Sequence, residues 1–419
     1  MNTINYKTIV ALVFFFAASF VCATAQDTST DFNTSALAKK VTAILQGKVD
    51  SNKIPGAVVA IKKNGQVICK TAVGYAQRYG DNNQLLSDPE AMTTEHLFDI
   101  ASLTKVIGTT TSIMLLVDRG LINVDDAAGK YIPAFTAPDK KQVTIRQLLT
   151  HTAGLYEWYP MYYRASNKQQ TYQLIGQLPL HFAVGKQRRY SDLGFTILGQ
   201  IVETVSGLSL DEFMRQNIFI PLGMQHTTYN PLKQAFTKIA ATSHGNPYEK
   251  RMVYDTSLGF VFKEIDPHQW NGWRNYTLRG EVNDGNAWYA NGGVSGAAGL
   301  FSTVDDLQRL VDMLMNKGRI NGAQFISEKT IALFLTRDSF KNGLGWMMDA
   351  DNSFMKHAPE GSFGHTGFTG TSIAVVPSKN ISIILLINRQ NTGLSAAGEY
   401  YNVNAIRQQI FTAVLEYNQ

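Results

Sequence analysis

A serine and a lysine three positions apart carry the strongest chemical signal in this sequence. Ser102 and Lys105 open a stretch whose other residues, as far as Val117, are uncharged. Three-residue spacing places both side chains on the same side of a helix. A serine hydroxyl is a weak nucleophile until a base lies beside it, and a lysine removed from water loses its proton more readily. The pair therefore predicts a nucleophile with its base.

The stretch that contains this pair favours a buried helix. A helix that is small or apolar all round belongs in a core, and a buried Lys105 needs a partner. The helix should open near Ser102, which brings its N-terminal dipole close to a developing oxyanion, and should end at Gly120. The apolar positions with helical spacing are Leu103, Val106, Ile107, Ile113, Met114 and Val117.

The same serine–lysine spacing occurs a second time, at Ser353 and Lys356. His357-Ala358-Pro359 follows this copy at once, and no apolar helix begins there. So short a pattern has chemical meaning only in the right structural context. We expect the second copy to be a chance occurrence.

Composition predicts a globular, exported protein. Of its 419 residues, 44% are apolar and 17% are charged, and a formal net charge of +5 is too small to suggest nucleic acid or an anionic membrane as a partner. The N-terminus has the pattern of a signal peptide: Lys7, an apolar run over 9–21, and the small-residue site Ala23-Thr24-Ala25. Cleavage after Ala25 predicts a periplasmic or secreted protein with no stable membrane span.

The two cysteines predict no intrachain disulfide. Cys22 leaves with the signal peptide, residues 1–25, so Cys69 remains alone. Because Cys69 lies in a strand-like run, we expect a buried, inert thiol.

Hydrophobic periodicity predicts an α+β fold with one antiparallel sheet. The strands of this sheet come from residues 26–119 and 301–419, and the terminal helices flank the sheet. Residues 120–300 form a mostly helical domain inserted between these two parts. The active site is expected between the sheet domain and the helical domain. We expect helices over 36–49, 144–149, 193–205, 210–217, 303–315 and 403–417, the fifth with a capping box of Thr303 and Asp306. We expect strands over 56–63, 66–73, 343–348, 371–376 and 381–388, and a loop over 78–96.

Two further short motifs follow the serine–lysine pair. Tyr190-Ser191-Asp192 precedes a predicted helix, and His365-Thr366-Gly367 opens the strand expected at 371–376. The three motifs, in this order, resemble those of the penicillin-recognising serine hydrolases, and within them the group of class C β-lactamases, DD-carboxypeptidases and esterases. The flanking segments that share the resemblance are 148–155, 292–302 and 363–371. Patterns typical of other hydrolases and of nucleotide-binding loops are absent from the sequence.

The resemblance implies a β-lactamase/transpeptidase-like fold and a role for each motif residue. Ser102 would attack a carbonyl carbon and form an acyl-enzyme, while Lys105 and Tyr190 share the function of the base. The backbone N–H groups of Ser102 and Phe368 would form the oxyanion hole. Neither a metal nor another cofactor is implied. The residues implied to contact the substrate are Asp192, His365, Thr366 and Gly367.

Two positions depart from the commonest pattern of that group. The third motif begins with His365 where β-lactamases commonly have lysine, and a mostly neutral imidazole would hold a carboxylate less strongly. Asp192 stands where asparagine is more usual. Its carboxylate either pairs with Lys105 and holds it protonated, which moves the base function to Tyr190, or caps the helix from Leu193. The sequence leaves both alternatives open.

Several other residues have roles that the sequence does not decide. His151, in a Thr-His-Thr-Ala-Gly turn, is expected to be structural. The aromatic stretches 155–163 and 248–289 either pack under long loops or line a substrate cleft. Asp284 and Asn286 precede a glycine-rich segment without an evident function.

These observations predict an exported serine hydrolase that forms an acyl-enzyme on Ser102. The expected activity is that of a DD-carboxypeptidase-like peptidase or an esterase, acting on D-amino-acid peptides such as those derived from peptidoglycan, or on small esters. The alternatives are a class C-type β-lactamase, and a penicillin-binding sensor that is acylated once and never turns over.

Overall fold

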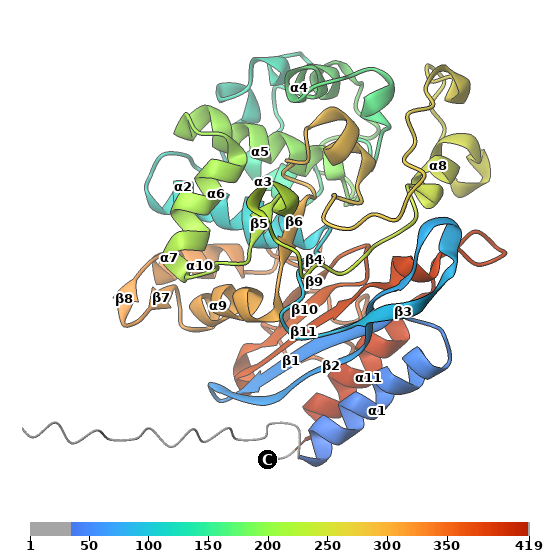
Figure 1. Cartoon of the computed structure of the whole chain (residues 1–419). Coiled ribbons are helices and arrows are strands. Elements are labelled where there is room, and N and C mark those ends of the chain that lie inside the picture. The colour runs from blue at the N-terminus through green and yellow to red at the C-terminus, as the bar shows by residue number, and fades with distance from the viewer. Residues whose placement is uncertain (1–34, 418–419) are drawn as a thin grey trace, which may run out of the picture. The chain divides into compact units, whose positions relative to one another are not determined.

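The computed structural model describes residues 35–417. The predicted signal peptide lies outside these residues and stays a prediction. Figure 1 shows the elements around a six-stranded sheet in the order β3-β2-β1-β11-β10-β9, in which all neighbours are antiparallel. Its strands are β1 (Gly56–Lys63), β2 (Gln66–Tyr79), β3 (Leu85–Ala91), β9 (Phe363–Thr366), β10 (Ser372–Val376) and β11 (Ile381–Ile387). The α+β prediction with one antiparallel sheet is confirmed.

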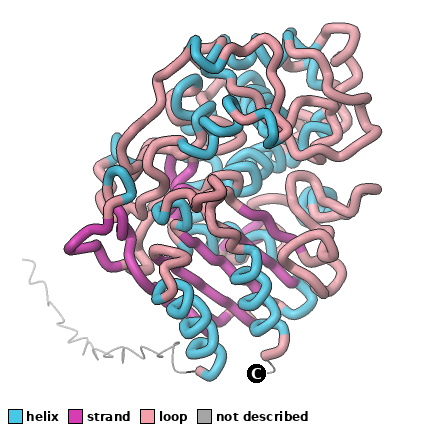
Figure 2. Tube along the Cα trace, turned by 90° about the vertical axis from the view of Figure 1, so that its right-hand side faces the viewer, coloured by secondary structure: helices cyan, strands magenta, loops and turns pink. Residues whose placement is uncertain are grey.

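Both faces of this sheet are covered, which explains why its central strands are apolar throughout. Alternate residues of a strand point to opposite faces. In β1, Val59 belongs to the core under the terminal helices, whereas Val58 belongs to the core on the other face. The terminal helices α1 (Ala36–Asp50) and α11 (Asn404–Leu415) pack together on the first face, and Figure 2 shows them as cyan coils against the magenta strands. On the other face, α9 (Val304–Met315) contacts β1 and β11.

The remaining elements surround the helix that follows Ser102. Two-stranded pairings join β4 (Phe98–Asp99), β6 (Leu300–Ser302) and β5 (Thr228–Tyr229) into a small sheet in that order, and β7 (Arg319–Ile320) pairs with β8 (Ala323–Gln324). The other helices are α2 (Thr111–Asp118), α3 (Ile145–Leu149), α4 (Lys168–Gln177), α5 (Asp192–Ser206), α6 (Leu210–Met214), α7 (Ile220–Leu222), α8 (Pro247–Tyr254) and α10 (Glu328–Phe334). The domain boundaries at residues 120 and 300 stay a prediction.

The helix after Ser102 differs from expectation in its first turns. Residues Lys105–Thr110 are π-helical, and α-helical geometry begins only at Thr111. Thr111 Oγ1 donates to the Val106 carbonyl at 3.0 Å, across five residues. Gly108 faces Met214 so closely that a Cβ at this position would lie 2.6 Å from the Met214 sulfur. Wide turns of this kind are rare and often occur at functional sites.

Three other expectations for local structure need correction. The stretch 78–96, expected as a loop, contains β3. The residues of this edge strand are mostly polar and show no clear strand pattern. The strand expected over 343–348 is only an isolated bridge between Met347 and Gly364. The His-Thr-Gly motif does not open β10 but ends a separate edge strand, β9.

The capping box at α9 is half formed. Thr303 Oγ1 accepts a hydrogen bond from the Asp306 N–H at 3.3 Å, as expected. The Asp306 carboxylate does not return to Thr303 and instead accepts hydrogen bonds from the His226 N–H and the Thr227 hydroxyl, at 2.6 and 3.0 Å. A long-range contact thus replaces the local one.

No single helix within residues 35–417 has both the length and the apolar character needed to cross a membrane. The helix α5 and the segment Leu210–Leu222 have the required length and apolar character only when they are taken together, and this pair is bent by 75°.

Candidate active site

Ser102 follows β4 at a backbone position that several contacts hold in place. The Asp99 carboxylate accepts hydrogen bonds from the N–H groups of Ala101 and Asn283, at 2.8 and 2.6 Å. Ala101, directly before Ser102, has a positive φ of 47°, which is uncommon and costly for a residue with a Cβ. The bonds to Asp99 therefore hold a strained turn that presents Ser102 at the start of the helix.

Lys105 is fully buried and makes three polar contacts at its Nζ atom. The Ser102 Oγ lies 3.0 Å away, the Ala297 carbonyl 2.8 Å, and Asp192 Oδ1 2.7 Å. Burial by itself would lower the pKa of Lys105, but the charges of Asp192 and Tyr190 outweigh burial and raise this pKa above its ordinary value. Lys105 is therefore an ammonium ion in the resting site.

The Tyr190 side chain lies between Lys105 and two histidines. Lys105 Nζ is 5.1 Å from the centre of the Tyr190 ring, and the ring centres of His151 and His365 are 4.4 and 6.0 Å from it. Within residues 35–417 the Tyr190 hydroxyl makes no hydrogen bond of good geometry. Burial raises its pKa, and the Asp192 charge adds to this, whereas Lys105 and Ser102 favour the phenolate and lower it; the net direction is upward.

His151 is a structural residue of this group, as expected. Its Nδ1 accepts a hydrogen bond from the Ser191 N–H at 3.0 Å, and its ring packs on Tyr190 and Phe195. Burial holds the pKa of His151 well below its usual range, so the ring is neutral. His151 thus fixes the start of α5 and the ring of Tyr190 together.

Asp192 pairs with Lys105 and does not cap α5. Ser191 is the capping residue: its hydroxyl accepts a hydrogen bond from the Gly194 N–H at 3.2 Å, while Asp192 is the first residue of the helix. Of the two alternatives that the sequence left open, the geometry supports the ion pair.

The turn after β9 is fastened to the segment before Ser102. Thr369 and Thr371 donate hydrogen bonds to the carbonyls of Asp99 and Ile100, at 2.7 and 3.1 Å. A Cβ on Gly367 would lie 2.4 Å from the Ile100 carbonyl oxygen, so only glycine allows this approach. Within residues 35–417 the backbone N–H groups of Ser102 and Phe368 donate no hydrogen bond. Both donors are available for an oxyanion.

His365 is buried on β9 and uncharged. Its Nδ1 donates to the Thr366 carbonyl at 2.9 Å, and its neighbour on β10 is Ile373. Burial and then the positive charge of Lys105 lower the pKa of His365 to about 3. The imidazole is therefore neutral over the whole physiological pH range, so it provides no charge for a carboxylate at any working pH.

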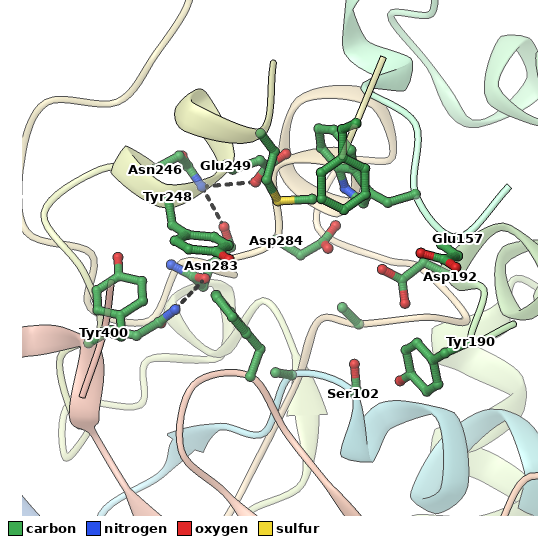
Figure 3. A pocket seen from close by; sticks show the side chains of 17 residues that line it. Ser102, Glu157, Tyr190, Asp192, Asn246, Tyr248, Glu249, Asn283, Asp284 and Tyr400 are labelled. Atoms are coloured by element: carbon green, nitrogen blue, oxygen red, sulfur yellow. Dashed lines mark hydrogen bonds between the residues drawn. The ribbon is translucent and has the colours of Figure 1, made fainter. Parts of the chain in front are cut away.

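Two cavities of opposite charge meet at Ser102. The first, which we call the acidic lobe, has a volume of about 330 Å³ and contains four carboxylates but no lysine or arginine in its lining. The second, the arginine lobe, has a volume of about 450 Å³ and includes Arg389 and Arg407, with Glu399, which pairs with Arg251, as the one carboxylate of its lining. Ser102, Tyr190, Tyr248, Phe368 and Tyr400 line both. Figure 3 shows Ser102 and Tyr190 on one side of the acidic lobe, with Glu249 and Asp284 opposite.

The two guanidinium groups of the arginine lobe have no acidic partner. Arg407 Nη2 donates to the Thr371 carbonyl at 2.8 Å, and Arg389 Nε donates to the Phe368 carbonyl at 2.9 Å. Neither forms an ion pair within the described part of the chain. Burial and then the charge of Arg389 lower the pKa of Arg407 to about 9. This lobe can therefore bind an anionic group of a substrate, the function that His365 cannot serve.

The aromatic stretches serve both purposes that the sequence left open. Tyr162, Trp270, Trp273 and Tyr289 pack against one another, with ring centres 4.7–6.3 Å apart. Asn286 is structural as well, since its side chain bonds the Met161 N–H and the Tyr159 carbonyl at 2.8 and 2.9 Å. From these two stretches, Trp158, Tyr248 and Phe260 line the acidic lobe.

Sequence reasoning missed Glu157, Glu249, Arg389 and Arg407. The first three lie in irregular or short segments without a recognisable pattern. Arg407 had a signal, because it lies next to Ile406 and three residues before Ile410 on the apolar face of α11. A charge among buried apolar positions needs a reason.

The fold and the site together define a class of protein. Terminal helices cover one face of the sheet, a Ser-x-x-Lys pair begins a buried helix, and a His-Thr-Gly turn lies beside it. This is the β-lactamase/transpeptidase-like arrangement of the penicillin-recognising serine hydrolases. Comparison of the sequence with family models agrees: the beta-lactamase family model matches residues 41–408. The chain belongs to the beta-lactamase family and is a serine hydrolase of that family.

Relatives with known names are spread over several activities. An N-acetylmuramyl-L-alanine amidase of Bacillus subtilis (strain 168) is 34% identical over 372 residues, which are 83% of this chain and 80% of that protein. A protein of Salmonella typhimurium (strain LT2), provisionally named a D-alanyl-D-alanine carboxypeptidase, is also 34% identical, over 83% of this chain and 82% of its own length.

Solved structures share the fold. EstCE1, described as a hydrolase with promiscuous acyltransferase activity, has a TM-score of 0.64 at 24% identity, covering 90% of this chain and 98% of its own. A class C beta-lactamase from Rhodobacter sphaeroides has a TM-score of 0.65 at 18% identity, covering 90% of this chain and 99% of its own.

Proposed function

We propose that this protein is an exported hydrolase that forms an acyl-enzyme on Ser102, with the activity of a DD-carboxypeptidase-like peptidase or an esterase on D-amino-acid peptides or small esters. The observation that carries the proposal is the Ser102 Oγ, 3.0 Å from Lys105 Nζ and beside two backbone N–H groups with no other acceptor. The relatives whose names refer to D-alanyl-D-alanine and N-acetylmuramyl-L-alanine support a substrate derived from the cell wall.

In the first step, Ser102 Oγ attacks the carbonyl carbon of the scissile bond, and the oxyanion that forms accepts hydrogen bonds from the Ser102 and Phe368 N–H groups. Because Asp192 holds Lys105 protonated, the proton of the Ser102 hydroxyl goes to Tyr190 in its phenolate form, a minor form that the Lys105 ammonium favours and that burial and the Asp192 charge oppose. Tyr190 then gives this proton to the leaving amine or alcohol as the scissile bond breaks. Ser102 is left as an ester.

In the second step, a water molecule attacks the ester carbonyl. Tyr190 accepts the proton of this water, the same two N–H groups bind the oxyanion, and the proton returns to Ser102 Oγ as the acid product leaves. Each residue ends the cycle in its initial protonation state.

A mapping experiment and a substrate panel test the proposal together. The purified protein is labelled with a fluorophosphonate and a fluorescent penicillin, and the adduct is mapped by mass spectrometry. Turnover is measured with a D-Ala-D-Ala peptide, a short p-nitrophenyl ester, nitrocefin and an N-acetylmuramyl-L-alanine peptide. We expect an adduct on Ser102 and steady turnover of the peptide or the ester. A label elsewhere would overturn the proposal, and a burst of one acyl group without steady turnover would favour the sensor.

Export is tested on protein from the native host. We expect a mature N-terminus at Gln26, outside the cytoplasm. A retained Met1, or a lipid on Cys22, would contradict this.

A further inference from the structure

The acidic lobe carries more negative charge than the chemistry at Ser102 requires. Of its four carboxylates, Asp192 is paired with Lys105 at 2.7 Å, and Glu157 has an exposed contact with Arg189 at 3.3 Å. Glu249 and Asp284 form no ion pair within the described residues. These two carboxylates lie on the side of the lobe that faces Ser102 and Tyr190 (Figure 3).

The hydrogen bonds of Glu249 and Asp284 leave acceptor positions open. Glu249 Oε2 accepts from the Gly285 N–H at 2.9 Å, and Asp284 Oδ1 accepts from the Ala287 N–H at 2.7 Å. The second oxygen of Glu249, Oε1, makes no hydrogen bond of good geometry among residues 35–417, and the Tyr162 hydroxyl, which interacts with this carboxyl group, makes none either. The protein thus satisfies this buried carboxylate only in part and gives it no ion pair, so a charged donor from a ligand would offset the remaining cost.

Arg274, the cation that acts on both carboxylates, already has other partners. The Arg274 guanidinium donates to the Val282 carbonyl at 2.8 Å and to the Asn246 side chain at 3.2 Å, and it lies 3.4 Å from Glu281. It therefore faces its own loop. Burial and the repulsion between the two carboxylates raise the pKa of Glu249, and burial and the Asp192 charge do the same for Asp284. The resting pair thus retains a proton that a bound cation would displace.

The other walls of the lobe suit an ammonium group. Trp158, Tyr248 and Phe260 present aromatic rings to the same space as the carboxylates. Aromatic faces attract cations, most strongly where water is excluded. The arginine lobe, which also reaches Ser102, contains two arginines, so a substrate with an amine and a carboxylate at its two ends would bind in one direction only.

We propose that the acidic lobe binds a free ammonium group on the acyl part of the substrate, through Glu249 and Asp284, and that the preferred substrates are peptides with an unblocked amine on that side of the scissile bond. This inference rests on the proposed acyl-enzyme function and names its substrate class.

The test compares substrates that differ only in that charge. The full mature chain is supplied with four forms of L-lysyl-D-alanyl-D-alanine: with both amines free, with one or the other amine acetylated, and with both acetylated. The release of D-alanine gives kcat/KM for each form. We expect at least one free amine to raise kcat/KM about tenfold over the doubly acetylated peptide. The variants Glu249→Gln and Asp284→Asn, alone and combined, should reduce this ratio towards one. The matched control Glu328→Gln removes an exposed carboxylate of α10 and should keep the ratio.

The failures of the inference and of the proposed function are distinguishable. If Ser102 is labelled by fluorophosphonate but all acetylated peptides are used as well as the free ones, the ammonium site is wrong and the acyl-enzyme stands. If Ser102 is not labelled, the function is wrong. Should the double variant not fold, as seen by its thermal melting, the single Asp284→Asn variant decides, since an unchanged ratio in that folded protein would overturn the proposal.

A pH series gives a second readout. Glu249 faces Asp284, Arg274 and Tyr162, and Asp284 also faces Asp192, Lys105 and Asp99. Because the ammonium group binds the ionised carboxylates, the preference for the free amine should increase as the pH rises from about 5 to about 8. A preference that is flat in the wild-type protein, or that rises equally in the double variant, would overturn the assignment.

Discussion

The two Ser-x-x-Lys segments of this chain have the same spacing and opposite surroundings. Lys105 is fully buried and contacts Ser102, Asp192 and the Ala297 carbonyl. Lys356 is exposed, and the Ser353 hydroxyl only closes a turn, donating to the Ala350 carbonyl at 3.2 Å and accepting from the Met355 N–H at 3.1 Å. The first copy has polar partners at both of its side chains, whereas the second copy lies in a surface loop.

The difference indicates that the partners, and not the spacing, distinguish the pair to which we assign the chemistry. Asp192 is 87 positions from Lys105, and Ala297 is 192 positions from it. Only the fold brings them together, and their charges determine that Lys105 is protonated. Four predictions test this contrast, and they follow in order of decreasing effect.

Removal of the nucleophile should have the largest effect. Ser102→Ala removes the atom that we propose forms the acyl bond, so we expect kcat/KM to fall by at least about 10³-fold and covalent labelling to disappear. Ser353→Ala should leave both unchanged. Labelling followed by peptide mapping checks this, and an adduct that persists in Ser102→Ala would contradict the assignment.

Replacing the lysine of each Ser-x-x-Lys copy by an uncharged residue should affect activity at the first copy only. Lys105→Met keeps the length of the side chain but removes the ammonium that stabilises the Tyr190 phenolate, so we expect a loss of about 10²- to 10⁴-fold in kcat/KM. Lys356→Met is the control and should behave as wild type. Melting temperatures of both variants show whether the loss reflects unfolding. A loss below about tenfold in folded Lys105→Met would place the base elsewhere.

Changing the partner of Lys105 should move a pKa. The Asp192 charge raises the pKa of both Lys105 and Tyr190, since it favours the ammonium and disfavours the phenolate. The active form needs a deprotonated base, so kcat/KM rises with pH, and in Asp192→Asn this rise should move to lower pH by about one unit. Asp305→Asn, which removes an exposed carboxylate of α9, is the control. A shift to higher pH would refute the proposed charge balance.

The smallest effect is expected at His365. Its imidazole is neutral down to about pH 3, so we expect no acidic limb in kcat/KM near the ordinary histidine pKa of about 6.5. In His365→Lys the new ammonium would lie beside Lys105, and the arginine lobe already supplies positive charge. The ratio of nitrocefin to ester hydrolysis should therefore rise by no more than about fivefold. A larger rise would show that the side chain at position 365 contacts the carboxylate of the substrate directly.

Local patterns predicted most of the sheet and its flanking helices. The hairpins β1–β2 and β10–β11 and the helices α1, α9 and α11 follow from apolar spacing and turn residues, and the structure confirms them. The missed strand β3 has a mostly exposed, polar sequence and is held by pairing with β2. The π-helical turns after Ser102 include Gly108, which packs closely against Met214, a contact between distant residues that no local pattern contains.

The sequence by itself determined the family and the positions of the three motifs, because a nucleophile, its neighbour on the helix and a glycine at a close approach are local requirements of residue type and spacing. The tertiary structure decided the charge states. It paired Asp192 with Lys105, made His365 neutral by burying it, and gathered Glu249 and Asp284 in one cavity at Ser102 and Arg389 and Arg407 in another. Such charge states depend on burial and on distances between groups remote in sequence, which are properties of the folded chain alone.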